Sequence, residues 1–352
     1  MRPSGYFDVG YGKDMAIMRT KTHWVFLGLL IGFMLLVPWL PFIDVSWLTF
    51  INFTLITIIA VLGLNITTGL AGQVSIGHAA FVMLGAYTAG ILTVKSGLPF
   101  IAALPLSAII PAAIGAVVGI PALRLYGFYL AIATLSFQFI AVYVVMHLTS
   151  VTGGSNGLFG VEAPSVAGYA FDTDHKIFYL ILAVLAVAIF VSVNLMRSRV
   201  GRAFVALRDN WIAAEASGVS TYIYKVMAFS IGAAFAGVSG CLLVHYIGLI
   251  RPEQLTVFDS IWYLGMISIG GWASTVGVIM GVTTLKLVEQ VLTINTPWFA
   301  DNFTMINPES WASLTSMAFG ALVIVLILWQ PRGLVYLVNM IKAYIRIWPF
   351  SY

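Results

Sequence analysis

Residues 63–87 read GLNITTGLAGQVSIGHAAFVMLGAY and place polar side chains among glycines within a hydrophobic chain. The polar side chains that we single out are Asn65, Thr68, Gln73, Ser75 and His78. Hydrocarbon offers no hydrogen-bond partners, so broken backbone and buried polar groups persist at membrane depth only where they face protein or water. The stretch therefore predicts a broken helix that lines a path through a membrane. A second interpretation stays open, in which the glycines allow close helix packing and the polar side chains bond to neighbouring helices.

The composition of the whole chain is that of a membrane protein with many spans. Of its 352 residues, 61% are hydrophobic and 9% are charged, and the mean hydropathy is +1.00, which lies outside the range of ordinary soluble domains. This length holds about ten spans of roughly 20 residues each and leaves little for a soluble catalytic domain. Cys241 is the only cysteine, so one chain contains neither a disulfide framework nor a thiolate metal site. We predict no catalytic residue, no metal site and no nucleic-acid partner.

Hydropathy, with Pro, Gly and charged residues as boundaries, predicts an all-α fold with about ten transmembrane helices. The predicted spans are residues 24–43, 47–66, 72–94, 100–122, 127–148, 177–196, 225–248, 257–270, 272–292 and 312–330. Two glycines, at 270 and 271, divide the run 257–292, which is either two short spans or one re-entrant segment. We predict a single membrane domain over 24–330, with tails at 1–23 and 331–352.

The distribution of Lys and Arg predicts the orientation. On a ten-span model that starts inside, most of the 17 basic residues lie on the cytoplasmic side, and the positive-inside rule then places both termini in the cytoplasm. The segment 149–176, which carries Glu162, Asp172 and Asp174, is then a periplasmic loop. The segment 197–224 is then cytoplasmic. A nine-span count would move the basic residues of the C-terminal tail outside, so charge favours two spans in 257–292.

The segment 197–224 predicts an amphipathic helix from Val200 to Gly218, because its apolar residues recur at spacings of three and four. One interpretation is a basic helix held by the anionic headgroups of membrane lipid. The other is a docking helix for a second protein. A partner would supply an energy source that the chain lacks, since no GxxxxGK[ST] phosphate loop occurs in it.

Four blocks of sequence resemble one known family. They read GLNITTGLAGQVSIGHAAFVMLGAYTA (63–89), GRAFVALRDNWIAAEASGVSTYIYKVMAFSIGAAFAGVSGCL (201–242), GGWASTVGVIMG (270–281) and PRGL (331–334). In this order they resemble the branched-chain amino acid permeases of bacterial ABC importers, specifically the LivM-type subunit. The resemblance runs through nearly the whole chain.

The resemblance implies a larger-bundle ABC importer permease fold and a non-catalytic role in the bacterial inner membrane. It implies as partners a second, LivH-type permease subunit, two cytoplasmic ATPase subunits and a periplasmic substrate-binding protein. ATP and Mg would bind to the ATPase subunits, and this chain would bind no cofactor. Importers of this class touch the ATPase through a short coupling helix that often reads EAA followed by glycine, which residues 215–218 match loosely. The residues that we assign to ATPase coupling are Arg202, Arg208, Asp209, Glu215 and Gly218.

The substrate implied by the resemblance is a branched-chain or other hydrophobic amino acid. Relatives in this family are also thought to move urea, short amides or aromatic acids, and the permease sequence does not separate these. A secondary carrier that needs no ATPase is the alternative from a different class. The spans contain few ionisable residues that could relay protons or bind sodium, which counts against it.

Overall fold

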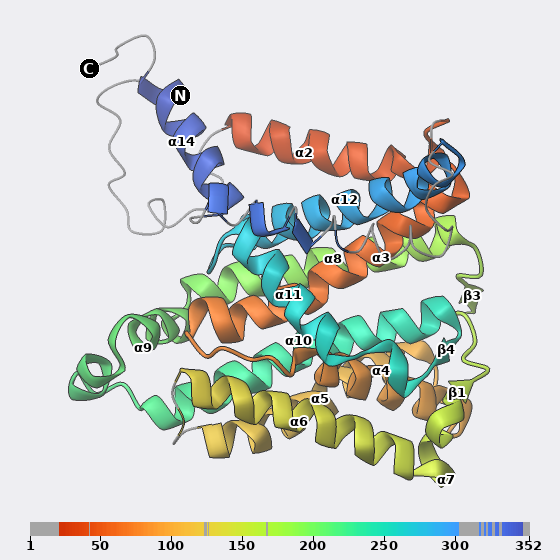
Figure 1. Cartoon of the computed structure of the whole chain (residues 1–352), viewed down its shortest axis with the longest axis horizontal. Coiled ribbons are helices and arrows are strands. Elements are labelled where there is room, and N and C mark those ends of the chain that lie inside the picture. The colour runs from red at the N-terminus through yellow and green to blue at the C-terminus, as the bar shows by residue number, and fades with distance from the viewer. Residues whose placement is uncertain are drawn as a thin grey trace.

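The computed structural model describes residues 21–41, 43–122, 125, 127–166, 168–302, 317, 320–321, 323–325, 328–330 and 333–347. Residues 1–20 of the predicted N-terminal tail and most of the predicted span 312–330 lie outside the described residues. Most of the described helices run side by side between two ends of the molecule (Figure 1). We call these ends the α9 end and the strand end, after the elements that lie there.

The described chain is built mainly from helices. These are α2 (Lys21–Leu36), α3 (Val45–Leu64), α4 (His78–Val94), α5 (Phe100–Ala122), α6 (Phe128–His147), α7 (Thr149–Thr152), α8 (Asp174–Arg197), α9 (Arg199–Ala216), α10 (Thr221–Ile247), α11 (Val257–Gly270), α12 (Thr275–Asn302) and α14 (Leu334–Ile347). Short turns of other helix types are η1 (Val37–Trp39), η2 (Asn65–Leu70), η3 (Gly154–Asn156) and η4 (Pro252–Gln254). The strands are β1 (Leu158–Phe159), β2 (Ser165–Val166), β3 (Tyr169–Ala170) and β4 (Leu249–Ile250), paired antiparallel as β1 with β4 and β2 with β3.

The helices follow the predicted spans closely. Among the described residues, six helices are long and apolar enough to cross a membrane: 45–70, 100–120, 128–147, 174–197, 221–247 and 275–295. The chain is therefore a helical, multi-pass membrane protein. The predicted span 72–94 is wrong at its start, because the helix begins only at His78. Gly72 has a φ of +69°, outside the helical region, and the chain stays non-helical through Gly77.

Helix α10 occupies the centre of the bundle, where glycines let three helices approach closely. A side chain at Gly237 would clash with the Ser107 carbonyl of α5 on one side. On the other side, Gly85 of α4 lies directly against Gly237, and Gly240 lies against the Val82 carbonyl. Close backbone approach of this kind is how helices associate where lipid removes most of the hydrophobic driving force.

The run 257–292 forms two separate helices that pack antiparallel. Gly270, near the end of α11, lies against Gly277 and Gly281 of α12, and Gly281 also lies against the Met266 carbonyl one turn earlier in α11. Helix α11 has 14 residues, which span about 21 Å at 1.5 Å per residue, less than the roughly 30 Å of a hydrocarbon core. It therefore occupies only part of the bundle's depth.

The central packing of α10 predicts a difference between two glycine substitutions. Gly237→Ala inserts a methyl group where the backbone of α5 already fills the space, and we expect a loss of about 1–3 kcal/mol in folding free energy. Gly265→Ala in α11 meets nothing within 4 Å and is expected to be neutral or stabilising, because Ala has the higher helix propensity. Thermal unfolding of the two purified variants checks this. Equal melting temperatures would contradict the packing described.

Candidate functional site

The backbone between α3 and α4 is broken inside the bundle. From α3 the chain passes into the π-helical turn η2, and residues 71–77 then form no helix. Together α3 and η2 run for 26 residues, and the His78 Nε2 atom lies 2.9 Å from the Ala60 oxygen near their middle. Helix α4 therefore begins about halfway across the bundle. Discontinuous helices and π-helical turns are both frequent at functional sites of membrane transporters and other proteins.

Side chains from two other helices hold the broken backbone. Ile76 N donates to Thr134 Oγ1 at 3.0 Å, Ala79 N donates to Ser260 Oγ at 2.9 Å, and Ala80 N donates to Gln138 Oε1 at 2.6 Å. All three acceptors are fully buried. Thr134, Ser260 and Gln138 were not among the residues predicted from the sequence. Each is an isolated polar residue in an apolar helix, and this pattern is the signal that could have identified it. The three bonds fix the start of α4 to α6 and α11.

The side chains of two predicted path residues, Thr68 and His78, bond to main-chain oxygens of the protein. The Thr68 hydroxyl donates to the Gln73 carbonyl at 3.2 Å. His78 Nε2 must be the donor to the Ala60 oxygen, since a carbonyl only accepts, and the ring packs edge-on against Tyr263. These contacts fit the packing interpretation for Thr68 and His78.

The other three predicted path residues carry polar atoms that are buried without a hydrogen bond. They are Asn65 Nδ2, Gln73 Nε2, Gln73 Oε1 and Ser75 Oγ. Only two further atoms of this kind, Asn52 Oδ1 and His245 Nε2, occur among the described residues. Each such atom costs about 1–3 kcal/mol in desolvation. Their concentration at the break is typical of a place where water or a solute supplies the missing bonds.

The segment α9 is not the continuous amphipathic helix predicted from Val200 to Gly218. At Asn210 the backbone leaves the helical region, with φ −160° and ψ 102°. Asn210 Oδ1 then accepts bonds from Ile212 N and Ala213 N, both at 3.1 Å, and so caps a second short helix. The predicted stop is confirmed, since Gly218 follows with a φ of +85°. The kink arises because an Asn cap competes with the helix for these N–H groups.

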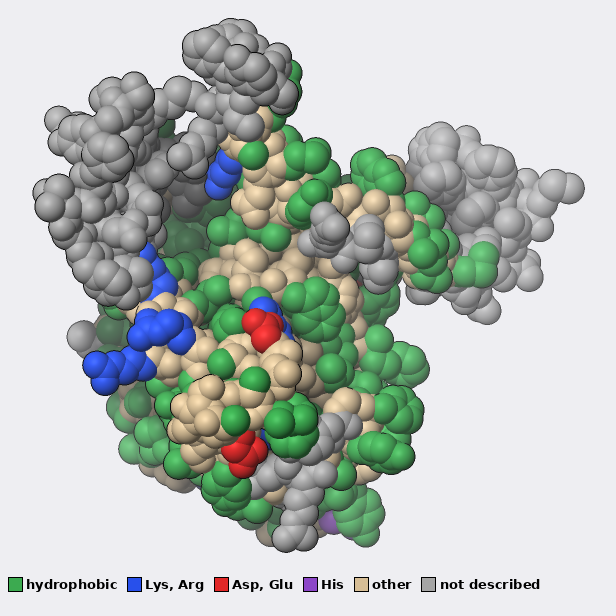
Figure 2. Space-filling model, turned by 90° about the vertical axis from the view of Figure 1, so that its left-hand side faces the viewer, with side chains coloured by type: hydrophobic (Ala, Val, Ile, Leu, Met, Phe, Trp, Pro, Cys, Tyr) green, Lys and Arg blue, Asp and Glu red, His purple; other side chains and the backbone are tan. Residues whose placement is uncertain are grey.

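The second part of α9 projects from the end of the molecule. Trp211 and Ile212 are 38% and 61% exposed, and Glu215 and Gly218 are exposed as well. In Figure 2, which views the α9 end, Lys and Arg side chains gather on one part of this face beside exposed acidic groups. Apolar side chains that project from a charged face are typical of a surface that docks another protein.

Arg208 joins this segment to the break. Its Nη1 donates to the Gly69 oxygen of η2 at 3.2 Å, and its Nε and Nη2 each lie 3.0 Å from Asp209 Oδ1. Its side chain also packs on Gly72, where a Cβ would lie 2.9 Å from Arg208 Cγ. The side chain of Arg202, another predicted coupling residue, donates from Nη1 to the nearby Arg197 oxygen at 3.0 Å. Of the five predicted coupling residues, Arg208 is the one whose side chain has a hydrogen bond to the break in the described part of the chain.

The turn between α11 and α12 also contacts η2, and a further segment packs on that turn. Asn65 Oδ1 accepts a bond from Ala273 N at 2.9 Å, in the turn between α11 and α12, where Ala273 itself has a φ of +58°. Gly333 lies directly against Gly271 of the same turn. We call the set Asn65, Gly69, Arg208, Ala273 and Gly333 the junction. It contains one or more residues from each of the four sequence blocks 63–89, 201–242, 270–281 and 331–334.

Comparison with known proteins finds a matching family model and several similar permease proteins. The family model described as "Branched-chain amino acid transport system / permease component" matches residues 46–328. The high-affinity branched-chain amino acid transport system permease proteins LivM of Salmonella typhimurium and Escherichia coli are each 31% identical over 286 residues, or 75% of this chain. A probable LivM permease of Methanocaldococcus jannaschii is 23% identical over 67% of this chain and 68% of its own length.

The match covers 64% of the length of the Salmonella and Escherichia relatives. No solved structure matches the chain.

The side-chain bonds at the start of α4 predict a stability effect. Gln138→Leu removes the acceptor of the Ala80 N–H and leaves this group unpaired in the bundle interior, so we expect a loss of about 1–3 kcal/mol. Ser136→Ala, on the same helix, removes an exposed hydroxyl that bonds only to its own helix and serves as the control. Thermal unfolding in one detergent compares the two variants. A Gln138→Leu variant as stable as the control would show that Gln138 does not hold α4.

Proposed function

Since the chain belongs to the family of permease components of branched-chain amino acid transport systems, we propose that it is the membrane subunit of an ATP-driven importer. The importer moves branched-chain or other hydrophobic amino acids across the bacterial inner membrane. The α9 end faces the cytoplasm and the strand end faces the periplasm. The chain itself is not an enzyme, and ATP and Mg bind to its partners.

The contact between Arg208 and the Gly69 oxygen is the observation that carries this proposal. A permease driven from outside needs a connection between the surface that the motor touches and the wall of the path. Arg208 provides one, since it belongs to the same element as the exposed Trp211 and Ile212 and contacts η2 directly. Movement of the docked segment therefore acts on the broken helix through one side chain.

The break supplies the wall of the path. Its unpartnered amide and hydroxyl groups, on Asn65, Gln73 and Ser75, are suited to brief hydrogen bonds with a zwitterionic solute or its water. None of the three carries a charge, so none holds an ammonium or carboxylate group tightly. Such a wall lets a solute pass without a high-affinity site and leaves selection to a soluble binding protein.

The complex contains further subunits on this proposal. A second, LivH-type permease completes the channel, and a periplasmic binding protein delivers the solute to the strand end. Of the two ATPase subunits, one docks on the second part of α9. The exposed apolar residues of α9 support the ATPase contact, because a lipid-bound basic helix would place Lys or Arg beside them, whereas residues 211–218 contain no basic residue. The prediction of about ten spans in a larger-bundle fold forms part of the same proposal.

Arg208 gives the direct test of coupling. Arg208→Met keeps an unbranched stem but removes the guanidinium and its bond to the Gly69 oxygen. We expect the uptake of leucine by the reconstituted complex to fall by about fivefold or more. ATPase subunits should still co-purify, because the exposed docking residues are unchanged. Uptake of radiolabelled leucine into proteoliposomes, with ATP supplied on the ATPase side, measures the effect.

Arg199→Met is the matched control, since Arg199 is an exposed residue at the start of the same element. Normal uptake by the Arg208→Met variant would contradict the coupling role. Uptake that continues without ATP would instead favour a secondary carrier.

Gln73 separates the path interpretation from the packing interpretation. Gln73→Met removes two unpartnered buried polar atoms, so we expect the variant to be more stable, by about 1 kcal/mol or more, and to transport more slowly. Melting temperature and uptake are measured on the same preparation, with the partly buried Gln290→Met in α12 as the control. If Gln73 serves packing alone, the variant will lose stability or transport at the normal rate.

A further inference from the structure

Helix α14 leaves the bundle at the α9 end. It contacts α11 and α12, and Gly333, just before it, lies against Gly271 in the turn between those two helices. Figure 1 shows α14 pointing away from the bundle, crosswise to the helices of the bundle. Leu334 at its start packs against the core, whereas every residue from Asn339 to Tyr344 is exposed. The described chain therefore covers mainly the start of α14.

The start of α14 lies at the level of one membrane surface. The membrane-crossing span 275–295 begins just after Gly271, so the turn that holds Gly333 is at the end of a span. Helix α14 has 14 residues, which extend for about 21 Å at 1.5 Å per residue, less than the roughly 30 Å of a hydrocarbon core. A crosswise helix of this length at this level lies along the membrane surface and does not cross the bilayer.

The sequence of α14, LVYLVNMIKAYIRI, divides between two faces. Met340, Ile341 and Tyr344 share one face by helical spacing, while Asn339 and Lys342 share the opposite face. The three apolar side chains are 51%, 54% and 69% exposed. An uncovered apolar face opposite a polar one is typical of a helix that lies in the membrane interface, where Tyr is also enriched.

The charge of α14 matches an anionic membrane surface. Its sequence contains Lys342 and Arg346 and no acidic residue. In the part of the chain that the structure describes, no acid forms an ion pair with Lys342. Basic residues beside an exposed apolar face are the composition that binds anionic headgroups. Residues 211–218 of α9 lack any basic residue, so α14 and the second part of α9 are suited to different partners.

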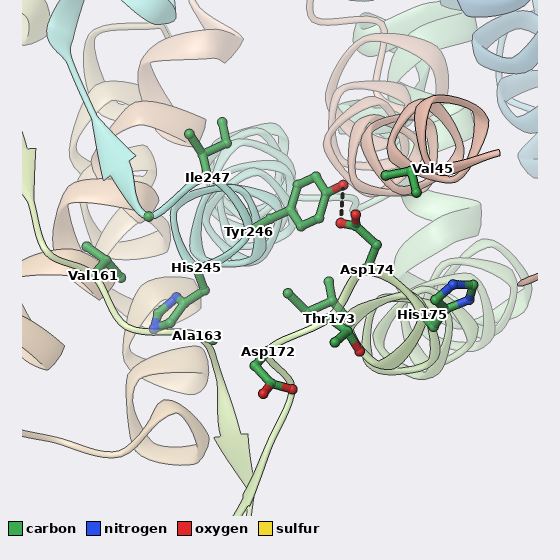
Figure 3. Close-up of a pocket in the computed structure, with 12 residues that line it drawn as sticks. Val45, Val161, Ala163, Asp172, Thr173, Asp174, His175, His245, Tyr246 and Ile247 are labelled. Carbon is green, nitrogen blue, oxygen red and sulfur yellow. Dashed lines mark hydrogen bonds between the residues drawn. The ribbon is translucent and has the colours of Figure 1, made fainter.

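Acidic groups at the strand end show the opposite arrangement. Asp172 and Asp174 line a cavity of about 510 Å³ at that end (Figure 3). Asp174 Oδ1 accepts a bond from the Tyr246 hydroxyl at 3.0 Å. Asp172 Oδ1 accepts a bond from Lys176 Nζ at 2.7 Å, and this bond lowers the pKa of the Asp172 carboxyl. These acids are satisfied within the protein, whereas the charge of Lys342 is left for a partner outside the described chain.

We propose that α14 lies in the headgroup region of the bilayer, with Met340, Ile341 and Tyr344 against the acyl chains and Lys342 on the phosphate of an anionic phospholipid. The bundle itself brings this helix to the bilayer, so lipid covers the apolar face without a further subunit. Because Gly333 packs on the turn that bonds to Asn65, a helix fixed in lipid also holds one side of the junction. The proposed function enters only in naming the cytoplasmic leaflet.

The test places a fluorophore on each face of α14 in the full chain, without other subunits or ATP. The chain is held in nanodiscs of about 70% phosphatidylcholine and about 30% phosphatidylglycerol. In a Cys241→Ser background, Ile341→Cys carries the NBD fluorophore on the apolar face and Asn339→Cys carries it on the polar face. We expect a phospholipid with a spin label on its acyl chain to quench position 341 about fivefold more strongly than position 339, and aqueous iodide to do the reverse.

Lys342 is tested by charge reversal in the Ile341→Cys chain. Lys342→Glu should lower the ratio of inserted to free helix by about tenfold, because attraction to anionic headgroups becomes repulsion. Arg199→Glu is the matched control, since it changes the net charge by the same amount at an exposed residue of α9, and it should leave the ratio unchanged. Removal of phosphatidylglycerol should lower the ratio for the chain with Lys342 and have less effect on the Lys342→Glu variant.

Equal quenching of the two positions by the lipid label, or insertion that Lys342→Glu leaves unchanged, would overturn the assignment. Shielding of position 341 from iodide that appears only when ATPase subunits or a LivH-type permease are added would make α14 a docking helix for protein and would also overturn it. The measurement needs neither ATP nor uptake. It can therefore fail while ATP-driven import succeeds, and a failure of import leaves its result intact.

Discussion

Backbone N–H groups inside a lipid-embedded bundle must find partners within the protein, because hydrocarbon supplies none. This constraint explains how the chain tolerates a non-helical stretch at 71–77. Thr134, Gln138 and Ser260 give the interrupted backbone the acceptors that a continuous helix would have provided from its own carbonyls. Helices α4, α6 and α11 are tied together at one level of the bundle as a result. The break is thus part of the fold: neighbouring side chains hold some of its backbone N–H groups, and several of its own buried side-chain atoms have no partner.

The polar groups of the break divide into two sets with different roles. Near His78 the donors and acceptors are paired, and the local structure is fixed. Around Gln73 and Ser75 they are unpaired, and the same stretch is in contact with Arg208 through Gly69 and Gly72. The start of α4 near His78 is therefore fixed, while the stretch before it contacts the exposed segment α9. A gated path requires this arrangement. The turn between α11 and α12 is included in it, because Asn65 bonds to Ala273.

Much of this architecture could be predicted from the sequence, because hydropathy and the positions of Gly indicate where lipid-facing helices begin and end. The predicted limits 257–270 coincide with α11, and Gly218 ends α9 as expected. The start of α4 could not be placed, because hydropathy does not distinguish a full span from a shorter helix preceded by non-helical chain. The kink at Asn210 was missed although Asn is a common N-cap, since apolar spacing alone favours one continuous helix. The roles of Gln138 and Ser260 depend on partners more than 50 residues away, and no local pattern in the sequence indicates these.

The central claim is that the unpaired groups of the break line a path that opens when the motor acts. The chain has one cysteine, so a variant with Cys241→Ser and Ser75→Cys carries a single thiol at the break in place of a hydroxyl of similar size. The most direct measurement is the rate at which a membrane-impermeant methanethiosulfonate reagent modifies that thiol in the assembled complex, with and without ATP. We predict modification that ATP accelerates and that a high concentration of transported solute slows. A thiol that stays unreactive under all conditions, in a complex that still transports, would contradict the account.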